Sequence, residues 1–181
     1  MNLKKTEIPD VMVLEPRVFT DSRGFFFESW NERSFQQLEI DMHFVQDNHS
    51  HSESGTLRGL HYQISRPQGK LVRVIRGAVF DVAVDLRRSS PTFGRWVGRE
   101  LSADNKCMLW IPPGCAHGFY ALSDADFVYK CTAYYDAEDE RTIRWNDPEL
   151  AIDWPLAGDQ PPLVSEKDKA GTSLREAEAY P

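Results

Sequence analysis

The chain has 181 residues, a formal net charge of −7 and 41% apolar residues. This length suits one globular domain, which we expect to span 1–181 and to bury roughly 70% of the surface of the unfolded chain. The negative charge argues against binding to nucleic acid, because the average surface would repel a phosphate backbone.

The sequence gives no sign of a membrane-bound or secreted protein. No stretch approaches the ~18 consecutive apolar residues of a membrane span. The first ten residues, MNLKKTEIPD, hold two lysines without an apolar stretch after them, so we expect no signal peptide. Cys107, Cys115 and Cys131 form no C-x-x-C pair, which favours buried thiols in a reducing compartment over disulfides or a cysteine metal site. We therefore expect a cytoplasmic protein.

Short segments rich in β-branched and aromatic residues dominate the chain, mostly separated by Gly, Pro, Asn, Asp or Ser. In chain order, strands are predicted within 11–19, 24–30, 56–63, 70–77, 78–86, 95–101, 107–112 and 126–135. Residues alternate within 78–86, which places Asp81 on the same face as Val79 and Ala83. A short helix is predicted over 31–39, and the tail can hold another, with Ser165 and Asp168 spaced as a capping box. Many short strands predict an all-β sandwich or barrel, whose mouth is the usual place for a small ligand.

One stretch is basic although the chain is acidic overall. No acidic residue occurs from Ser54 to Phe80, where His61 has five cationic neighbours in the sequence: Arg58, Arg66, Lys70, Arg73 and Arg76. Such a local group of cations permits a small anionic ligand even in an acidic protein. Arg66, Arg73 and Arg76 can equally be solvated charges, and His61 a hydrogen-bonded histidine of the core.

Several common signatures are missing from the sequence. It contains no G-x-G-x-x-G, G-x-x-x-x-G-K-[ST] or G-x-S-x-G pattern, which excludes dinucleotide, P-loop and α/β-hydrolase chemistry. His49 and His51 could face the same side of a strand as zinc ligands. The stretch 48–55 around them reads as a polar loop, however, and a zinc site would need one or two more ligands.

The stretch IPPGCAHGF at 111–119 resembles the second sequence motif of cupins, which are small jelly-roll barrels, and it contains the motif's histidine, His117. In metal-binding cupins the first motif supplies His-x-His followed by a glutamate. The matching stretch here reads HYQ at 61–63, and Ala121 stands where the second motif often has asparagine. Because two of the usual ligands are absent, we expect the barrel without a metal.

Over nearly its full length the sequence resembles the dTDP-4-dehydrorhamnose 3,5-epimerase family, the cofactor-free cupin enzymes of dTDP-L-rhamnose synthesis. The resemblance runs in order through IPDVMVLEPRVFTDSRGFFFES, FVQDNHS, LRGLHYQ, QGKLVRVIRGAVFDVAVDLRRSSPTFG, WIPPGCAHGF, YKCTAYYDAEDERTIRWNDPELAIDWP and LVSEKD. It implies a cupin-type jelly-roll barrel with a few short helices. It also implies conversion of dTDP-4-dehydro-6-deoxy-D-glucose to dTDP-4-dehydro-L-rhamnose by a homodimer that exchanges N-terminal strands.

The reaction of this family inverts two carbons, C3 and C5, that flank a C4 ketone. Each inversion needs a base on one face, donors toward the C4 oxygen and an acid on the opposite face. By resemblance, His61 is the base, Asp168 is its carboxylate partner and Tyr129 is the acid. Histidine suits proton abstraction near neutral pH. Without the resemblance, Asp168 reads as a helix-capping or solvated acid and Tyr129 as an alternating barrel residue.

The resemblance also implies a set of substrate contacts. Arg58 and Lys70 would hold the pyrophosphate and the sugar oxygens, and His117 would contact the sugar. Arg58 precedes His61 by three residues and points away from it unless a bulge intervenes, which Gly59 makes possible. The remaining predicted contacts are Arg23, Glu28, Gln46, Asp47, Asn48, Glu140 and Lys167. The spacing favours Tyr135 over Tyr134 beside the ligand, although neither is placed in the catalytic set.

Three other functions compete with this one. A mono-epimerase would invert C3 or C5 alone on a related nucleotide 4-keto sugar, and product analysis separates the two. A non-catalytic sugar-nucleotide-binding jelly roll or lectin would need neither His61 nor Tyr129, and a turnover assay settles the question. A metal-dependent cupin oxygenase would be revealed by metal analysis of the purified protein.

Overall fold

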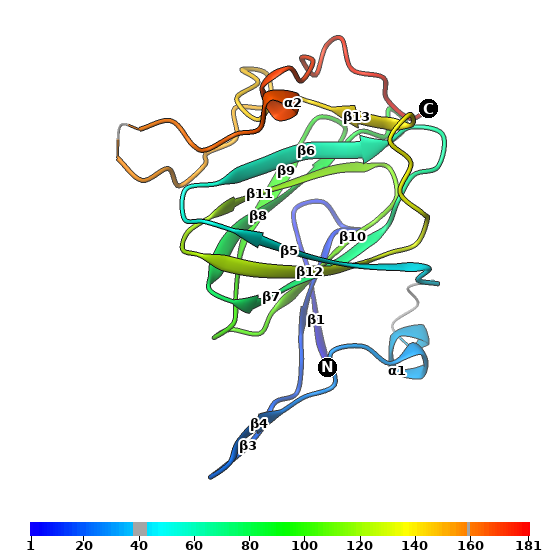
Figure 1. The fold of residues 1–181 in the computed structure, drawn as a ribbon. Coiled ribbons are helices and arrows are strands. Elements are labelled where there is room, and N and C mark those ends of the chain that lie inside the picture. The colour runs from blue at the N-terminus through cyan, green and yellow to red at the C-terminus, as the bar shows by residue number, and fades with distance from the viewer. Residues whose placement is uncertain (38–42, 159) are drawn as a thin grey trace.

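Two antiparallel β-sheets face each other and enclose the central core (Figure 1). The computed structural model describes residues 1–37, 43–158 and 160–181. The first sheet has six strands in the order β1-β2-β10-β7-β12-β5, and the second has five in the order β13-β6-β11-β8-β9. The strands of these sheets are β1 Asn2–Lys5, β2 Met12–Glu15, β5 Gln46–Ser52, β6 Leu57–Gln63, β7 Lys70–Arg76, β8 Ala78–Asp85, β9 Trp96–Ser102, β10 Met108–Ile111, β11 Cys115–Ala121, β12 Ala125–Cys131 and β13 Glu140–Thr142. The predicted jelly-roll barrel is confirmed.

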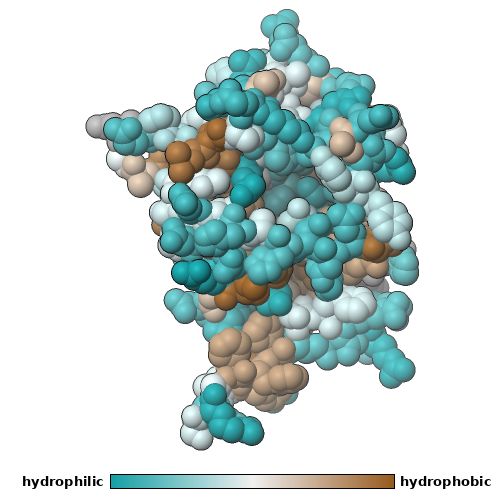
Figure 2. Space-filling view, viewed as in Figure 1, coloured by the Kyte–Doolittle hydropathy of each residue, from teal (hydrophilic) through white to brown (hydrophobic). Residues whose placement is uncertain are grey.

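A third, two-stranded sheet forms an arm that projects away from the two large sheets (Figure 1). It consists of β3 Phe19–Asp21 and β4 Gly24–Phe26, and we call residues 19–26 the arm. Phe19, Phe25 and Phe26 are 51%, 60% and 70% exposed. Figure 2 shows apolar surface gathered at this lower end of the molecule. A cluster of exposed phenylalanines of this kind indicates an interaction surface.

The space between the large sheets is filled by β-branched and aromatic side chains. Val79 and Ala83 of β8 point into this core, whereas Val82 and Val84 point to the outer face, as the alternation predicted. The C-terminal part of the chain covers that outer face, with Leu150 and Trp154 packed on it. The five-stranded sheet is therefore buried on both sides, and its outer cover brings the C-terminal segment close to β6.

Every predicted strand segment overlaps an observed strand, but β1, β5, β11 and β13 were missed entirely and β3 was reached only at Phe19. β11 is buried at all its positions, so its sequence shows no alternation to detect. β5 overlaps the stretch interpreted as a polar loop over 48–55, and that interpretation is wrong up to Ser52. Its polar residues form a strand because backbone pairing with β12 along its whole length satisfies the main chain at the sheet edge.

Two short helices accompany the sheets. α1, Glu32–Gln36, begins at Asn31, whose side chain accepts hydrogen bonds from two backbone N–H groups of the first turn. Residues 38 and 39 of the predicted helix lie outside the described residues. α2, Glu166–Lys169, begins at Ser165, whose Oγ accepts the Asp168 N–H at 3.1 Å. Within the described ranges, neither helix has the length and apolar character needed to cross a membrane.

Candidate active site

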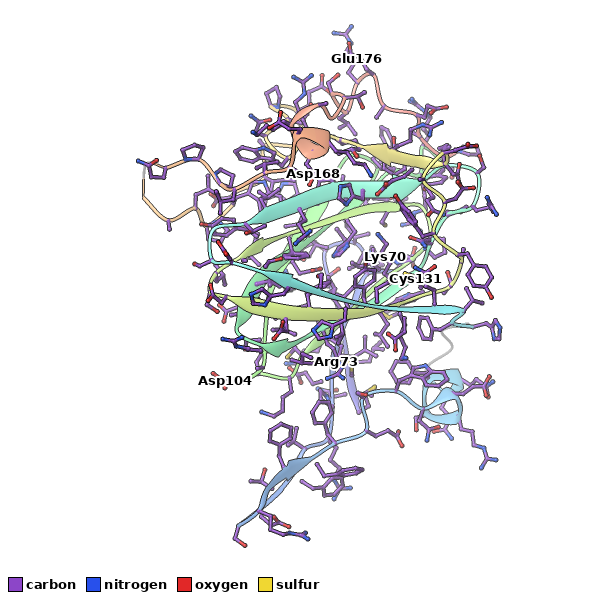
Figure 3. All side chains as sticks on the ribbon, viewed as in Figure 1. Lys70, Arg73, Asp104, Cys131, Asp168 and Glu176 are labelled. Atoms are coloured by element: carbon purple, nitrogen blue, oxygen red, sulfur yellow. The ribbon has the colours of Figure 1, made fainter. Side chains whose placement is uncertain are left out.

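His61 and Asp168 form a hydrogen-bonded pair where β6 meets α2. The His61 Nε2 atom lies 2.6 Å from Asp168 Oδ1, and the Gly59 N–H donates to Asp168 Oδ2 at 3.3 Å. Figure 3 shows Asp168 between α2 and β6. Burial alone would raise the pKa of the Asp168 carboxyl, but its bonds with His61, Gly59 and Ser165 lower it. The capping-box prediction is therefore half right: Ser165 caps the helix, while the Asp168 side chain is directed to β6 instead.

A bulge in β6 places both Arg58 and His61 at the site. The pairing moves two residues along β11, from His117 to Phe119, but three along β6, from His61 to Arg58. Gly59 has a φ of +120°, and a Cβ there would lie 2.6 Å from the Gly118 Cα. Only glycine fits this position without a backbone shift. The predicted bulge is confirmed.

Two hollows open beside His61. The first, of about 250 Å³, lies between the sheets and brings together six predicted site residues: Gln46, Asn48, His61, Lys70, Tyr129 and Glu140. Gln68, Cys131 and Tyr135, which are outside the predicted set, complete its lining. The second, of about 480 Å³, lies along α2 and holds Arg58, His61, Lys167 and Asp168. His61 lines both, so a ligand that fills them lies against its ring.

Lys70 places an ammonium group inside the barrel. It pairs in register with Cys131 across β7 and β12, and Figure 3 shows the two side by side between the sheets. Burial lowers the pKa of Lys70, although the nearby Cys131, Glu140 and Asp81 partly oppose that effect. Within the described part of the chain, no carboxylate lies within 4.0 Å of the Lys70 or Arg58 side-chain nitrogens. Both cations are therefore available to an anionic ligand.

Tyr129 approaches the first hollow from the six-stranded sheet, whereas His61 approaches it from the five-stranded sheet. Its ring packs on the core and lies 5.8 Å from the Phe127 ring centroid. Burial raises the pKa of the Tyr129 phenol, and the nearby Cys131 and Glu140 raise it further. The hydroxyl therefore carries its proton at neutral pH and can donate it.

Glu140 lies on the other side of the His61 ring. Its Oε1 atom is 4.0 Å from His61 Nδ1. Its Oε2 atom accepts a hydrogen bond from the Tyr135 hydroxyl at 2.8 Å and forms an ion pair with Lys167. Burial alone would raise the pKa of Glu140, but Lys167, Tyr135 and His61 together lower it. The carboxylate is therefore ionised at neutral pH.

A second histidine–carboxylate pair lies beneath the site. The His117 Nε2 atom is 2.9 Å from Asp81 Oδ2, both side chains are buried, and His117 pairs in register with His61. Burial lowers the pKa of His117 and raises that of Asp81. Asp81 was missing from the predicted site, and the available signal was the alternation of 78–86, which had placed this acid on the same face as Val79 and Ala83.

Four predicted contacts do not line these hollows, and one of them is His117 of the buried pair. Arg23 lies in the arm and forms an ion pair with Asp21, and Glu28 accepts from Asn31 and Ser34 near α1. Asp47 forms an ion pair with Lys130 and, together with Asn48 and Tyr129, lines a separate hollow. Of the two adjacent tyrosines, Tyr135 lines the first hollow.

The histidines considered as zinc ligands lie away from this site. His51 Nδ1 is 2.9 Å from Asp126 Oδ1, and His49 Nε2 is 3.6 Å from the same atom. Among residues 1–37, 43–158 and 160–181, no three His, Cys, Asp or Glu side chains are arranged to hold a metal ion.

A protein-family model described as dTDP-4-dehydrorhamnose 3,5-epimerase matches residues 5–176. The chain belongs to this family. A dTDP-4-dehydrorhamnose 3,5-epimerase from Pseudomonas aeruginosa is 58% identical to it over 183 aligned positions, which cover 100% of both chains. The family assignment makes this chain an isomerase, as the resemblance implied.

Solved structures of the family share the fold. The crystal structure of dTDP-6-deoxy-D-glucose-3,5-epimerase from Legionella pneumophila Philadelphia 1, in complex with dTDP-4-keto-L-rhamnose, is 52% identical with a TM-score of 0.94, covering 98% of this chain and 94% of that one. ChmJ, a 3'-monoepimerase from Streptomyces bikiniensis in complex with dTDP-quinovose, is 35% identical with a TM-score of 0.87, covering 94% and 87%. The same scaffold thus carries both double and single epimerases.

Proposed function

We propose that this chain inverts C3 and C5 of dTDP-4-dehydro-6-deoxy-D-glucose and releases dTDP-4-dehydro-L-rhamnose. One observation carries the proposal: His61, held by Asp168, and Tyr129 line the same hollow from two facing sheets. A base and an acid on opposite sides of a sugar ring are what inversion requires, because one group on one face would return the proton to the side it left.

The base acts through its Nδ1 atom. Asp168 accepts a hydrogen bond from the Nε2–H group, which fixes the tautomer and leaves the Nδ1 lone pair free toward the hollow. When Nδ1 removes a proton from C3 or C5, the electron pair of the broken C–H bond moves toward the C4 oxygen and forms an enolate. The Asp168 carboxylate stabilises the imidazolium formed in the same step.

Lys70 and Arg58 supply positive charge for the enolate and the pyrophosphate. Lys70 is the half-buried cation of the first hollow, so its interaction with a developing oxyanion is screened by solvent less than that of a surface charge. Arg58 lines the second hollow, where its guanidinium suits a phosphate. The enolate carbon then takes a proton from the Tyr129 hydroxyl on the opposite face. The resulting phenolate recovers a proton from solvent before the next step.

Nucleotide recognition is assigned to the remaining predicted residues. Gln46, Asp47 and Asn48 offer donors and acceptors for the thymine edge, His117 stands behind the sugar, and Glu140 and Lys167 stand beside it. Arg23 and Glu28 line neither hollow of their own chain. We therefore assign these two to the barrel of a second copy, in a homodimer whose exposed arm phenylalanines bury against the partner.

The proposed enzyme is a single domain over 1–181 that works in the cytoplasm. The free thiols of Cys107, Cys115 and Cys131 support a reducing compartment.

Similarity to a 3'-monoepimerase makes single inversion the second candidate. NMR of the product made from dTDP-4-dehydro-6-deoxy-D-glucose distinguishes the two. Inverted configurations at both C3 and C5 support the proposal, and inversion at one carbon supports the mono-epimerase.

A further inference from the structure

Double inversion requires His61 to remove a proton from carbon twice in each turnover. Each turnover removes two protons from carbon, one at C3 and one at C5, and the first hollow contains one histidine that can take them. After the first removal, Nδ1 carries a proton and cannot act as a base again. The imidazole must therefore lose that proton while the singly inverted sugar is still bound.

The routes by which His61 could lose the proton are few. Its Nε2 atom is hydrogen-bonded to Asp168, whose side chain is 4% exposed, and a ligand in the second hollow, which Asp168 lines, covers that side from water. A sugar in the hollow covers the Nδ1 side. The remaining neighbour of Nδ1 is the Glu140 carboxylate, with Oε1 at 4.0 Å, a gap that a small side-chain rotation or one water molecule closes.

Glu140 also connects this buried point to the surface. Its own side chain is 10% exposed, but Oε2 bonds to the hydroxyl of Tyr135 and the ammonium of Lys167, whose side chains are about half exposed. The position has the polar partners needed to keep the carboxylate ionised and therefore ready to accept a proton. A proton that reaches Glu140 therefore lies next to two side chains, Tyr135 and Lys167, that are in contact with bulk water.

Resting on the double inversion proposed above, we propose that Glu140 is a proton relay that returns His61 to its basic form between the two epimerisations. In this step the Nδ1–H bond breaks and an O–H bond forms on Glu140 Oε1, which leaves a neutral imidazole and a carboxylic acid. The acid passes its proton to water, so the relay ends as a carboxylate. Tyr129 recovers a proton from solvent for each one it donates, and the turnover is balanced.

The Glu140→Gln variant tests this relay. Glutamine keeps the shape and can still accept from Tyr135, but it cannot take a proton. We expect the fraction of singly inverted sugar released at low conversion to rise at least 10-fold, because the intermediate dissociates before His61 is reset. Affinity for dTDP alone should change less than about 3-fold. Glu140→Asp should partly restore double inversion, and formate should partly restore it in Glu140→Ala.

Glu138→Gln is the matched control. This substitution removes the same charge two residues away from Glu140. The Glu138 side chain is exposed and forms no hydrogen bond or ion pair among the described residues. This variant should release the same product mixture as the wild type. A Glu140→Gln enzyme that is slower but keeps the wild-type ratio of singly to doubly inverted sugar would overturn the relay and leave the double inversion intact. A wild-type enzyme that inverts one carbon only would overturn both.

Discussion

The Nε2 atom of His61 lies 2.6 Å from Oδ1 of Asp168, although the two residues are 107 positions apart in the sequence. β6 supplies one and the capped turn of α2 supplies the other, so the pair depends on the C-terminal segment covering the outer face of the five-stranded sheet. The same bond decides which imidazole nitrogen faces the hollow. Most of the proposed mechanism follows from that choice.

Replacing His61 by asparagine should lower kcat by at least about 10³-fold, because no other histidine lines the first hollow among the described residues, and the Glu140 carboxylate beside it is a weaker base than an imidazole. Binding of dTDP and the thermal unfolding midpoint should remain close to wild type, measured by calorimetry. His51→Asn is the matched control, since the His51 ring binds only Asp126 on the exposed side of β5. Near-wild-type turnover in His61→Asn would remove His61 from the mechanism.

Asp168→Asn should lower kcat by roughly 10²-fold, less than the loss of His61, because the amide can present its NH₂ to Nε2 and favour the wrong tautomer. KM should change little, since the carboxylate acts through His61. Steady-state kinetics with product detection measure both constants. A variant that is less stable but fully active would return Asp168 to a purely structural role at α2.

Strands could be predicted from the sequence where buried and exposed residues alternate along the chain. Strands without this alternation were missed. β8 and β7 were found from β-branched residues, but β11 is buried on both faces and β5 is polar throughout, so neither has the period of a half-buried strand. The Ser165 cap was predictable because its two partners are three residues apart. Contacts of that range depend on local geometry alone.

The site was less accessible to sequence reasoning, because its contacts depend on strand register. The placement of His61 opposite His117, and of Asp81 beneath it, requires the pairing of β6, β11 and β8. Family resemblance supplied His61, Asp168 and Tyr129 without that register. It did not supply Asp81, whose local signal was an acid on the same strand face as Val79 and Ala83.

The arm gives a test of subunit exchange that uses two inactive proteins. If Arg23 serves the partner's barrel, Arg23→Ala and His61→Asn each inactivate every site in their own homodimers. Mixed dimers, however, contain one site with both residues intact. Unfolding and refolding an equal mixture should therefore restore about a quarter of wild-type activity. An inactive mixture whose dimers have demonstrably exchanged would place Arg23 in the site of its own chain, and an active Arg23→Ala homodimer would place it in none.

Acid should destabilise the protein through Asp85, which is buried at the end of β8. Burial alone would raise the pKa of this carboxyl, but bonds from Arg87, Ser90 and Thr92 outweigh it and lower the pKa to about 2 from an ordinary value of 3.8. A depressed carboxyl pKa stabilises the fold above the unfolded value and loses that contribution as the pH falls through the folded one.

Asp85 should therefore lose its stabilising effect between pH 3.8 and about 2. Asp85→Asn should lower the free energy of unfolding at pH 7 by about 2 kcal/mol and flatten its pH dependence in that window. Denaturant titrations from pH 7 down to pH 2 measure both effects, with the exposed Asp104→Asn as the control. An unchanged pH dependence in Asp85→Asn would show that the acid transition arises elsewhere.

The most direct test of the double inversion is NMR of the product formed from dTDP-4-dehydro-6-deoxy-D-glucose in D₂O. The wild-type enzyme should place deuterium at both C3 and C5, each with inverted configuration, because each carbon is deprotonated and then reprotonated by solvent-exchanged groups. Tyr129→Phe, which loses only the hydroxyl, should still wash deuterium into the sugar through His61 but form little inverted product. Deuterium at a single carbon of the wild-type product would contradict the double inversion and make the chain a mono-epimerase.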